Sequence, residues 1–98
     1  MRHFNQLTPA EDERLTILAE ECAEVIQCIC KIQRHGYEST NPKIPNSETN
    51  REALQRELGD LLHSANRMFA AFDLSREIVN ERAITKADRV LPYLHHQD

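Results

Sequence analysis

Two acidic clusters hold the residue types in this sequence that are best suited to chemistry. Glu20, Glu21 and Glu24 form the first cluster, and Glu57 and Asp60 form the second. The pair Glu21 and Glu24, like the pair Glu57 and Asp60, is spaced by three positions, which puts both carboxylates on one side of an α-helix. Like charges this close repel each other unless a cation lies between them. Carboxylate oxygens favour Mg²⁺, with Mn²⁺ as the alternative, over zinc or copper. The pattern therefore predicts a metal-dependent helical protein that acts on phosphate groups.

Length and composition favour one small domain, predicted to span residues 1–98. Of the 98 residues 40% are hydrophobic but only 5% are aromatic, and there is no tryptophan, which is typical of an aliphatic core between helices. The formal net charge of −4 argues against binding to a nucleic-acid backbone. The sequence shows neither a signal peptide nor an apolar run of membrane-spanning length. We therefore expect a cytoplasmic protein with no nucleic acid and no membrane among its partners.

The cysteines, Cys22, Cys28 and Cys30, all fall in one helical segment. Their odd number does not suit the disulfide framework of a small secreted protein. Cys28 and Cys30 would lie about 200° apart around a helix, so they cannot bind one zinc ion together. We expect reduced, buried thiols that pack as small apolar side chains.

Apolar residues at helical spacing predict three helices, at about residues 9–35, 50–72 and 75–91. A polar loop from Gly36 to about Glu48 is long enough to reverse the chain. The predicted fold is therefore all-α, an antiparallel helical hairpin plus a third helix. The expected start and stop signals of these helices are Thr8, Pro9, Glu11, Gly36, Thr49, Glu52, Ser75 and Pro92.

Rotation about the helix axis, at about 100° per residue, relates the acids to the apolar stripes. The stripe of the first helix is predicted to centre between Leu18 and Ile29, with Cys22 on it. Glu21 and Glu24 then lie on one flank of that stripe, while Glu20 faces solvent.

The acids of the second helix are predicted to lie on the matching flank. Glu57 and Asp60 border a stripe centred near Leu54 and Ala65, in the same rotational sense as the acids of the first helix. In an antiparallel hairpin all four carboxylates would then line one edge. The alternative is that they are ordinary solvated charges. Their place at the stripe margin argues against it, as does the absence of Lys or Arg four positions from Glu21 and Glu57.

The two acidic clusters resemble the signature of the MazG-like, all-α nucleoside triphosphate pyrophosphohydrolases. That signature is Glu-Glu-x-x-Glu, a spacer, and Glu-x-x-Asp, and the resemblance extends from about Leu15 to about Arg89. It implies Mg²⁺-dependent cleavage of a nucleoside triphosphate between the α- and β-phosphates, which gives a monophosphate and pyrophosphate. It implies that the metal ligands are Glu21, Glu24, Glu57 and Asp60, with Glu20 completing the catalytic set in a supporting or water-orienting role.

The resemblance also implies basic phosphate contacts and an oligomer. Lys31 and Arg34 in the first helix and Lys86 and Arg89 in the third are the candidate substrate-binding residues. We expect a homodimer or a dimer of dimers, in which a second copy completes a four-helix-type core. Some relatives stack the base on a tryptophan of the first helix, which this chain lacks. The aromatic residues left for that role are Phe4, Tyr37, Phe69, Phe72 and Tyr93.

Two other classes of protein compete with this interpretation. A di-iron carboxylate bundle needs Glu-x-x-His on two helices, and the nearest approach here is one Asp60-x-x-His63. We interpret His63 as a partly buried structural residue rather than a metal ligand. The second competitor is a non-catalytic helical interaction or regulatory module that retains the fold.

Overall fold

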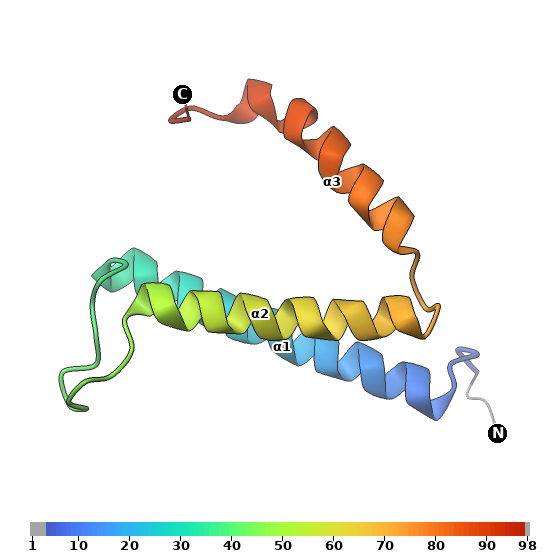
Figure 1. Ribbon diagram of the computed structural model, residues 1–98, viewed down its shortest axis with the longest axis horizontal. Coiled ribbons are helices and arrows are strands. Elements are labelled where there is room, and N and C mark those ends of the chain that lie inside the picture. The colour runs from blue at the N-terminus through green and yellow to red at the C-terminus, as the bar shows by residue number, and fades with distance from the viewer. Residues whose placement is uncertain (1–3, 98) are drawn as a thin grey trace.

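The computed structural model of the chain describes residues 4–97 and consists, over that range, of helices and turns without a strand. The helices are α1 (Pro9–His35), α2 (Asn50–Ala70) and α3 (Arg76–Val90), and a short 3₁₀ turn, η1 (Leu91–Tyr93), follows α3. In Figure 1, α1 and α2 lie side by side and antiparallel, and α3 leads away from them. The all-α fold and the helical hairpin are thus confirmed, while residues 1–3 and 98 lie outside the described range.

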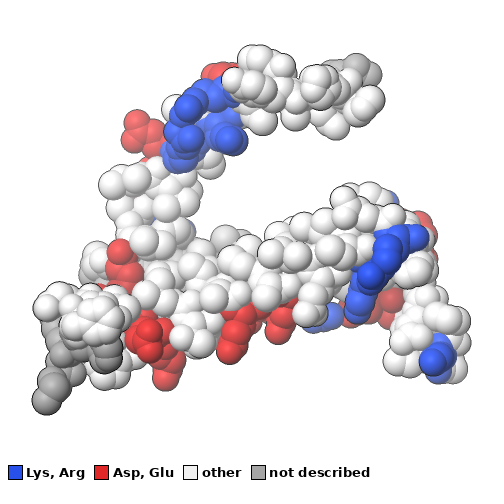
Figure 2. All heavy atoms as spheres, turned by 180° about the vertical axis from the view of Figure 1, so that it is seen from behind, with Lys and Arg blue, Asp and Glu red and all other residues white. Residues whose placement is uncertain are grey.

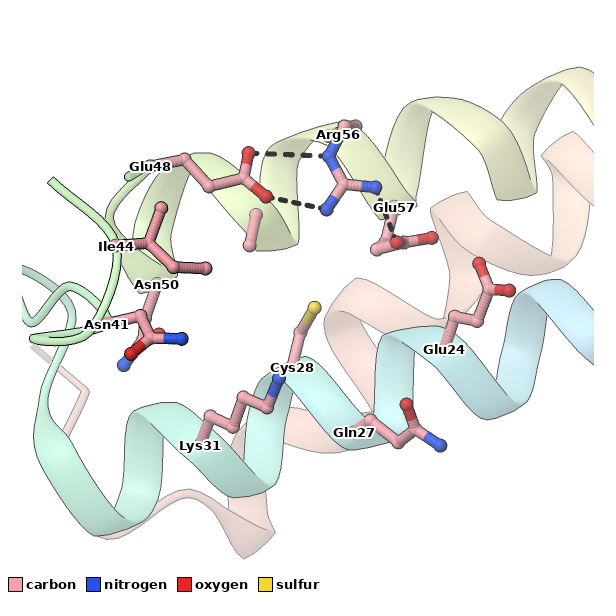
Figure 3. A pocket seen from close by; sticks show the side chains of 11 residues that line it. Glu24, Gln27, Cys28, Lys31, Asn41, Ile44, Glu48, Asn50, Arg56 and Glu57 are labelled. Carbon is pink, nitrogen blue, oxygen red and sulfur yellow. Dashed lines mark hydrogen bonds and ion pairs between the residues drawn. The ribbon is translucent and has the colours of Figure 1, made fainter. Parts of the chain in front are cut away.

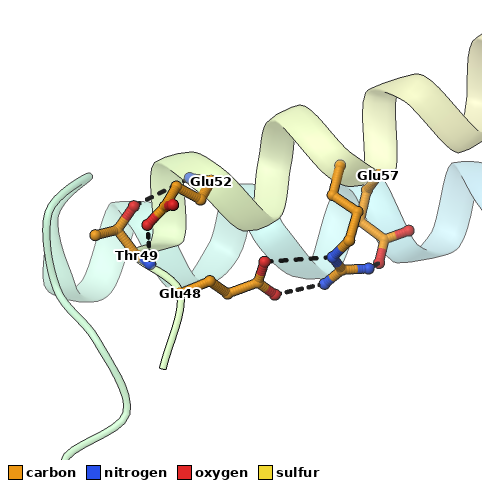
Figure 4. Close-up of polar contacts among 5 residues, drawn as sticks. Glu48, Thr49, Glu52 and Glu57 are labelled. Atoms are coloured by element: carbon orange, nitrogen blue, oxygen red, sulfur yellow. Dashed lines mark hydrogen bonds and ion pairs between the residues drawn. The ribbon is translucent and has the colours of Figure 1, made fainter. Parts of the chain in front are cut away.

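Capping residues set the helix boundaries. The side chain of Thr8 accepts a hydrogen bond from the Glu11 backbone N–H at 3.1 Å, and Glu11 Oε1 accepts one from the Thr8 N–H at 2.8 Å. Thr49 and Glu52 repeat this capping box at the start of α2, at 3.1 and 2.9 Å (Figure 4). Each such cap stabilises a helix by about 1 kcal/mol. Gly36, with φ at 90°, ends α1 as predicted.

The α2 helix ends two residues earlier than predicted, because the backbone turns left-handed at Phe72 (φ 63°). The Phe72 N–H donates to the Phe69 carbonyl at 3.1 Å, and the Asp73 N–H donates to the Met68 carbonyl at 3.0 Å. This pair of bonds closes the last turn of a helix and normally has glycine at the left-handed position. Ser75 then caps α3, as predicted.

The seam between α1 and α2 consists of shielded side chains that repeat every three or four residues, as in a coiled coil. Its members on α1 are Leu18, Glu21, Val25, Cys28 and Ile32, and its members on α2 are Leu54, Glu57, Leu61, Ser64 and Met68. The seam therefore runs through Glu21 and Glu57 and not beside them.

The predicted stripe on α1 is partly wrong, because Cys22 and Ile29 are exposed and the seam lies rotated toward Glu21. Of the cysteines only Cys28 is buried, so the predicted burial of Cys22 and Cys30 is also wrong. All three thiols are free, as expected. Some of the apolar residues outside the seam form a second stripe on the outside of the hairpin, which includes Ile26, Ile29, Leu58 and Leu62.

The chain leaves more surface open than a folded monomer of its size. Residues 76–89 of α3 are exposed throughout. The radius of gyration is 17.4 Å, against about 13 Å for a compact domain of 100 residues. The accessible surface is 8205 Å², against about 5800 Å² expected for a monomer of this mass. Within residues 4–97, no helical segment combines the length and the hydropathy that a membrane span requires.

Candidate metal centre

Four carboxylates meet halfway along the hairpin. One oxygen from each of Glu21, Glu24, Glu57 and Asp60 can be chosen so that all lie within 4.8 Å of one another. The first two belong to α1 and the last two to α2. Glu57 is only 7% exposed and Glu21 is half-buried, whereas Glu24 and Asp60 are exposed. The structure thus brings the four predicted ligands together in a cluster that is closed on the seam side and open to solvent.

Two oxygens in this cluster have no hydrogen-bond partner among the described residues. Glu21 Oε2 and Glu57 Oε2 are both shielded from solvent and unpaired. Leaving a buried polar atom unpaired costs on the order of 1–3 kcal/mol, and more when the group is charged. A divalent cation would satisfy both atoms, and the all-oxygen donor set suits Mg²⁺ or Mn²⁺. The residues present therefore fit the predicted metal.

Repulsion inside the cluster changes the acidity of Glu24. A hydrogen bond that its protonated carboxyl makes with Glu57 is the largest cause of a raised pKa, and the charges of Glu57 and Glu21 raise that pKa further. A divalent cation between the carboxylates would oppose this shift in pKa, since ligand oxygens bind metals in the ionised form.

An arginine that the sequence did not single out borders the cluster. Arg56 Nη1 donates to Glu57 Oε1 at 2.6 Å, while Arg56 Nη2 and Nε donate to the two oxygens of Glu48 at 2.7 and 3.3 Å (Figures 3 and 4). Adjacent helix positions do not ordinarily face each other, so periodicity gave no reason to pair Arg56 with Glu57. The hydrogen bonds to Glu48 and Glu57 raise the pKa of the Arg56 guanidinium, which stays charged.

A hollow of about 550 Å³ adjoins the cluster on the side of the α1–α2 loop (Figure 3). Glu24, Arg56 and Glu57 form its inner end, and the amide side chains of Gln27, Asn41 and Asn50 line its walls together with Lys31. The hollow therefore places hydrogen-bonding groups and a cation next to the carboxylates.

A second hollow of about 560 Å³ lies farther along the loop and is lined by Lys31, Arg34 and His35. It shares Lys31, Asn41 and Asn50 with the first hollow. Of the residues predicted to bind substrate, Lys31 thus lines both hollows, whereas Arg34 lines only the second.

The remaining predicted substrate-binding residues lie elsewhere. Lys86 and Arg89 are on the exposed part of α3, away from the hairpin seam. Figure 2 shows basic side chains gathered on α3 and at the loop end of the hairpin, with acidic side chains between them along the hairpin. Glu20 is exposed and outside the set of four. Within one chain, Lys86 and Arg89 are therefore not part of the cluster.

The candidate base-stacking residues do not line either hollow. The guanidinium carbon of Arg51 lies 4.3 Å from the centre of the Tyr37 ring. The guanidinium carbon of Arg76 lies 4.7 Å from the centre of the Phe69 ring. Phe4, Phe72 and Tyr93 are exposed. His63, expected to be partly buried, is exposed as well, because its helix position faces away from the seam.

The chain is similar to a known protein family. A family model described as the MazG nucleotide pyrophosphohydrolase domain matches residues 10–95. The matched range includes the four clustered carboxylates, Arg56 and both hollows. No curated protein and no solved structure matches the chain.

Proposed function

Because this chain belongs to the MazG nucleotide pyrophosphohydrolase family, we propose that it is a Mg²⁺-dependent nucleoside triphosphate pyrophosphohydrolase. In the proposed reaction, water attacks a nucleoside triphosphate, the bond between the α- and β-phosphates breaks, and a nucleoside monophosphate and pyrophosphate leave. The observation that supports this most directly is the convergence of four carboxylates, two of which have an unpaired, shielded oxygen.

Glu21, Glu24, Glu57 and Asp60 would hold the metal, either Mg²⁺ or Mn²⁺. When bound, such an ion supplies charge neutralisation for phosphate oxygens and activation of water. The shielded Glu21 and Glu57 are suited to fixing its position, since their side chains are packed in the seam. The exposed Glu24 and Asp60 face the solvent side, from which substrate must arrive. Glu20 keeps the proposed supporting role, which includes orienting the attacking water.

The hollow beside the cluster is the proposed substrate site. Amide side chains from Gln27, Asn41 and Asn50 offer both donors and acceptors to a base edge or a sugar hydroxyl. Lys31 would contact the outer phosphates through its compact ammonium group, and Arg34 through the forked donors of its guanidinium. With no aromatic side chain lining the hollow, we propose that base recognition relies on hydrogen bonds and not on stacking.

We further propose that the chain works as a homodimer or a dimer of dimers. Its accessible surface exceeds that of a folded monomer by about 2400 Å², and a stable interface of standard size buries about 800 Å² per partner. The outer stripe with Leu62 and the exposed α3 supply apolar surface for such contacts. In an assembly Lys86 and Arg89 of one copy could serve the site of another.

A panel of canonical and damaged ribo- and deoxyribonucleoside triphosphates with Mg²⁺ tests this proposal, with separate assays for pyrophosphate and orthophosphate. We expect pyrophosphate and monophosphate in equal amounts from at least one substrate. Glu57→Gln and Asp60→Asn should abolish turnover while circular dichroism shows unchanged helicity. Wild-type rates in either variant would refute the site. Mg²⁺ binding without turnover of any triphosphate would favour the non-catalytic module.

A further inference from the structure

The two oxygens of the Glu57 carboxylate have different surroundings. Oε1 accepts a hydrogen bond from Arg56 at 2.6 Å, whereas Oε2 is shielded from solvent and unpaired. Figure 3 shows this carboxylate lying across the seam from Glu24, with the guanidinium of Arg56 on its other side. Oε1 is thus held by Arg56, and Oε2 has no hydrogen bond that would compete with a metal ion in the carboxylate cluster.

The guanidinium that holds Glu57 is itself fixed. Its Nε and Nη2 atoms bind both oxygens of Glu48, and its Nη1 atom binds Glu57, so one planar fork bridges two carboxylates. Glu48 is the last loop residue before the cap of α2, Thr49. A rigid, forked donor fixes a carboxylate in direction as well as position, which an ammonium group does not do.

We propose that Arg56 is a positioning residue that holds Glu57 in its metal-binding orientation, with Glu48 anchoring Arg56 from the loop. This inference rests on the proposed function only in taking the carboxylate cluster as a divalent-metal site. Groups that hydrogen-bond to a metal ligand and orient it typically contribute 10- to 100-fold to metal affinity.

The charge of Arg56 and its proposed positioning role predict opposite changes in metal affinity when Arg56 is removed, so the two can be told apart by experiment. A guanidinium close to the cluster repels a cation, so removing Arg56 should tighten metal binding if Arg56 acts only as a charge. If Arg56 orients Glu57, removing it should weaken binding. Arg56→Lys separates the two effects, because lysine keeps the charge but cannot bridge both carboxylates.

The experiment is a titration of the full chain with Mn²⁺ alone, followed by electron paramagnetic resonance, and with Mg²⁺ alone by calorimetry. We expect Arg56→Lys and Arg56→Gln each to weaken Mn²⁺ binding by about tenfold or more. The matched control is Arg51→Gln on the same helix, which breaks an exposed pair with Glu38 and should change Mn²⁺ affinity less than about twofold. Circular dichroism checks the fold, and Arg56→Lys decides the question if Arg56→Gln unfolds.

Each outcome bears on the proposal. Wild-type affinity in Arg56→Lys, or tighter binding in Arg56→Gln, would overturn it. A wild-type chain that binds neither ion would overturn both this inference and the proposed function. A chain that binds Mn²⁺, loses affinity in Arg56→Lys and yet hydrolyses no triphosphate would leave the inference standing and refute only the proposed function.

The role of Glu48 has its own test. If Glu48 acts through Arg56, Glu48→Gln should weaken Mn²⁺ binding several-fold in the wild type but by less than about twofold in the Arg56→Gln background. Equal effects of Glu48→Gln in the two backgrounds would show that Glu48 acts as a separate charge, and would overturn its part of the proposal.

Discussion

Arg14 of α1 binds Asp73, just beyond α2, through both carboxylate oxygens, at 2.5 Å from Nε and 3.0 Å from Nη2. The pair joins α1 to the turn that follows α2, at the end of the hairpin opposite the long loop (Figure 1). Its side chains are only 21% and 12% exposed, unlike the open pair of Arg51 and Glu38. A shielded, two-point ion pair is stronger than an exposed one, so the open end of the hairpin depends on it.

Asp73→Asn should lower the stability of the chain at neutral pH and make that stability depend less on pH. Hydrogen bonding to Arg14 lowers the pKa of Asp73 below its usual value of 3.8. A carboxyl with a lowered pKa in the folded state adds stability above pH 3.8 and loses it as the pH falls through the folded pKa. Urea unfolding of wild type and Asp73→Asn at pH 7, 5 and 3 measures this. We expect the two midpoints to converge toward pH 3.

The control for this prediction is Asp88→Asn on the exposed helix α3, which should follow the wild type at every pH. A gap between wild type and Asp73→Asn that stays constant with pH would show that Arg14 stabilises the fold through packing and not through the ionised carboxylate.

Glu24→Gln should stabilise the metal-free protein at pH 7 and destabilise it relative to wild type when Mg²⁺ is present. The hydrogen bond with Glu57 and the neighbouring charges raise the pKa of Glu24 above 4.5. A carboxyl with a raised pKa has its favourable contribution fully present below pH 4.5 and loses it as the pH rises through the folded pKa. In metal-free buffer the two proteins should therefore become equally stable at acid pH. Thermal unfolding with EDTA or with Mg²⁺, at pH 7 and below pH 4.5, measures the reversal. Glu24→Gln that is less stable than wild type without metal would contradict the repulsive cluster.

Glu20→Gln should lower pyrophosphate release less than Glu21→Gln. Glu21 lies in the seam with a shielded, unpaired oxygen, whereas Glu20 is exposed and outside the set of four carboxylates. Removing a ligand should cost at least tenfold more in kcat/KM than removing a supporting group, on the order of 1.4 kcal/mol. Steady-state assays of both variants with the best substrate of the panel measure the order. If Glu20→Gln is the more impaired, the assignment by helix rotation is wrong.

Local chemistry made the helix ends of this chain predictable. The caps at Thr8 and Thr49 and the stop at Gly36 depend on bonds between residues a few positions apart, which the sequence displays directly. The convergence of two acidic pairs was also predictable, because it follows from helical spacing and a loop long enough to form a hairpin.

The face of α1 that packs against α2 was harder to predict from the sequence. Its apolar residues form two stripes, and hydrophobicity alone does not say which stripe faces α2 and which faces outward. Ile29 lies on the outer stripe, so the predicted centre was drawn away from Glu21. The burial of Glu57 escaped prediction because it depends on which face of α2 packs against α1. Its contact with Arg56 escaped prediction because Glu48, a loop residue, holds the guanidinium from its other side.

If the proposed oligomer forms through the outer stripe, Leu62→Arg should reduce it to monomers. Leu62 is exposed in the single chain, so the substitution disturbs no contact within the hairpin. An arginine in the middle of an apolar interface would be desolvated without a partner, which costs several kcal/mol. Light scattering after size exclusion measures the mass, and Leu62→Met, which preserves an apolar side chain, should keep the wild-type mass. A wild-type chain with the mass of a monomer would refute the proposed oligomer, and an oligomeric mass that Leu62→Arg leaves unchanged would place the interface elsewhere.

Phe72→Gly should be more stable than Phe72→Ala by about 1 kcal/mol. Phe72 takes the left-handed position that ends α2, with φ at 63°, and a Cβ atom at such a position costs roughly 1–2 kcal/mol. Only glycine removes this cost, and its greater freedom in the unfolded chain returns part of the gain. Urea unfolding of both variants measures the difference. Equal stabilities would show that the turn relaxes when the ring is removed.

Comparison of Phe72→Ala with wild type reports on what the ring of Phe72 contacts. In the single chain this side chain is 92% exposed, so Phe72→Ala should leave the stability of a dilute monomer unchanged. If a second copy covers the ring, Phe72→Ala should instead lose stability at high protein concentration, because the unfolding of an oligomer depends on concentration. Unfolding of wild type and Phe72→Ala at two concentrations about a hundredfold apart distinguishes these cases. A loss in Phe72→Ala that is the same at both concentrations would place the contact of the ring inside one chain.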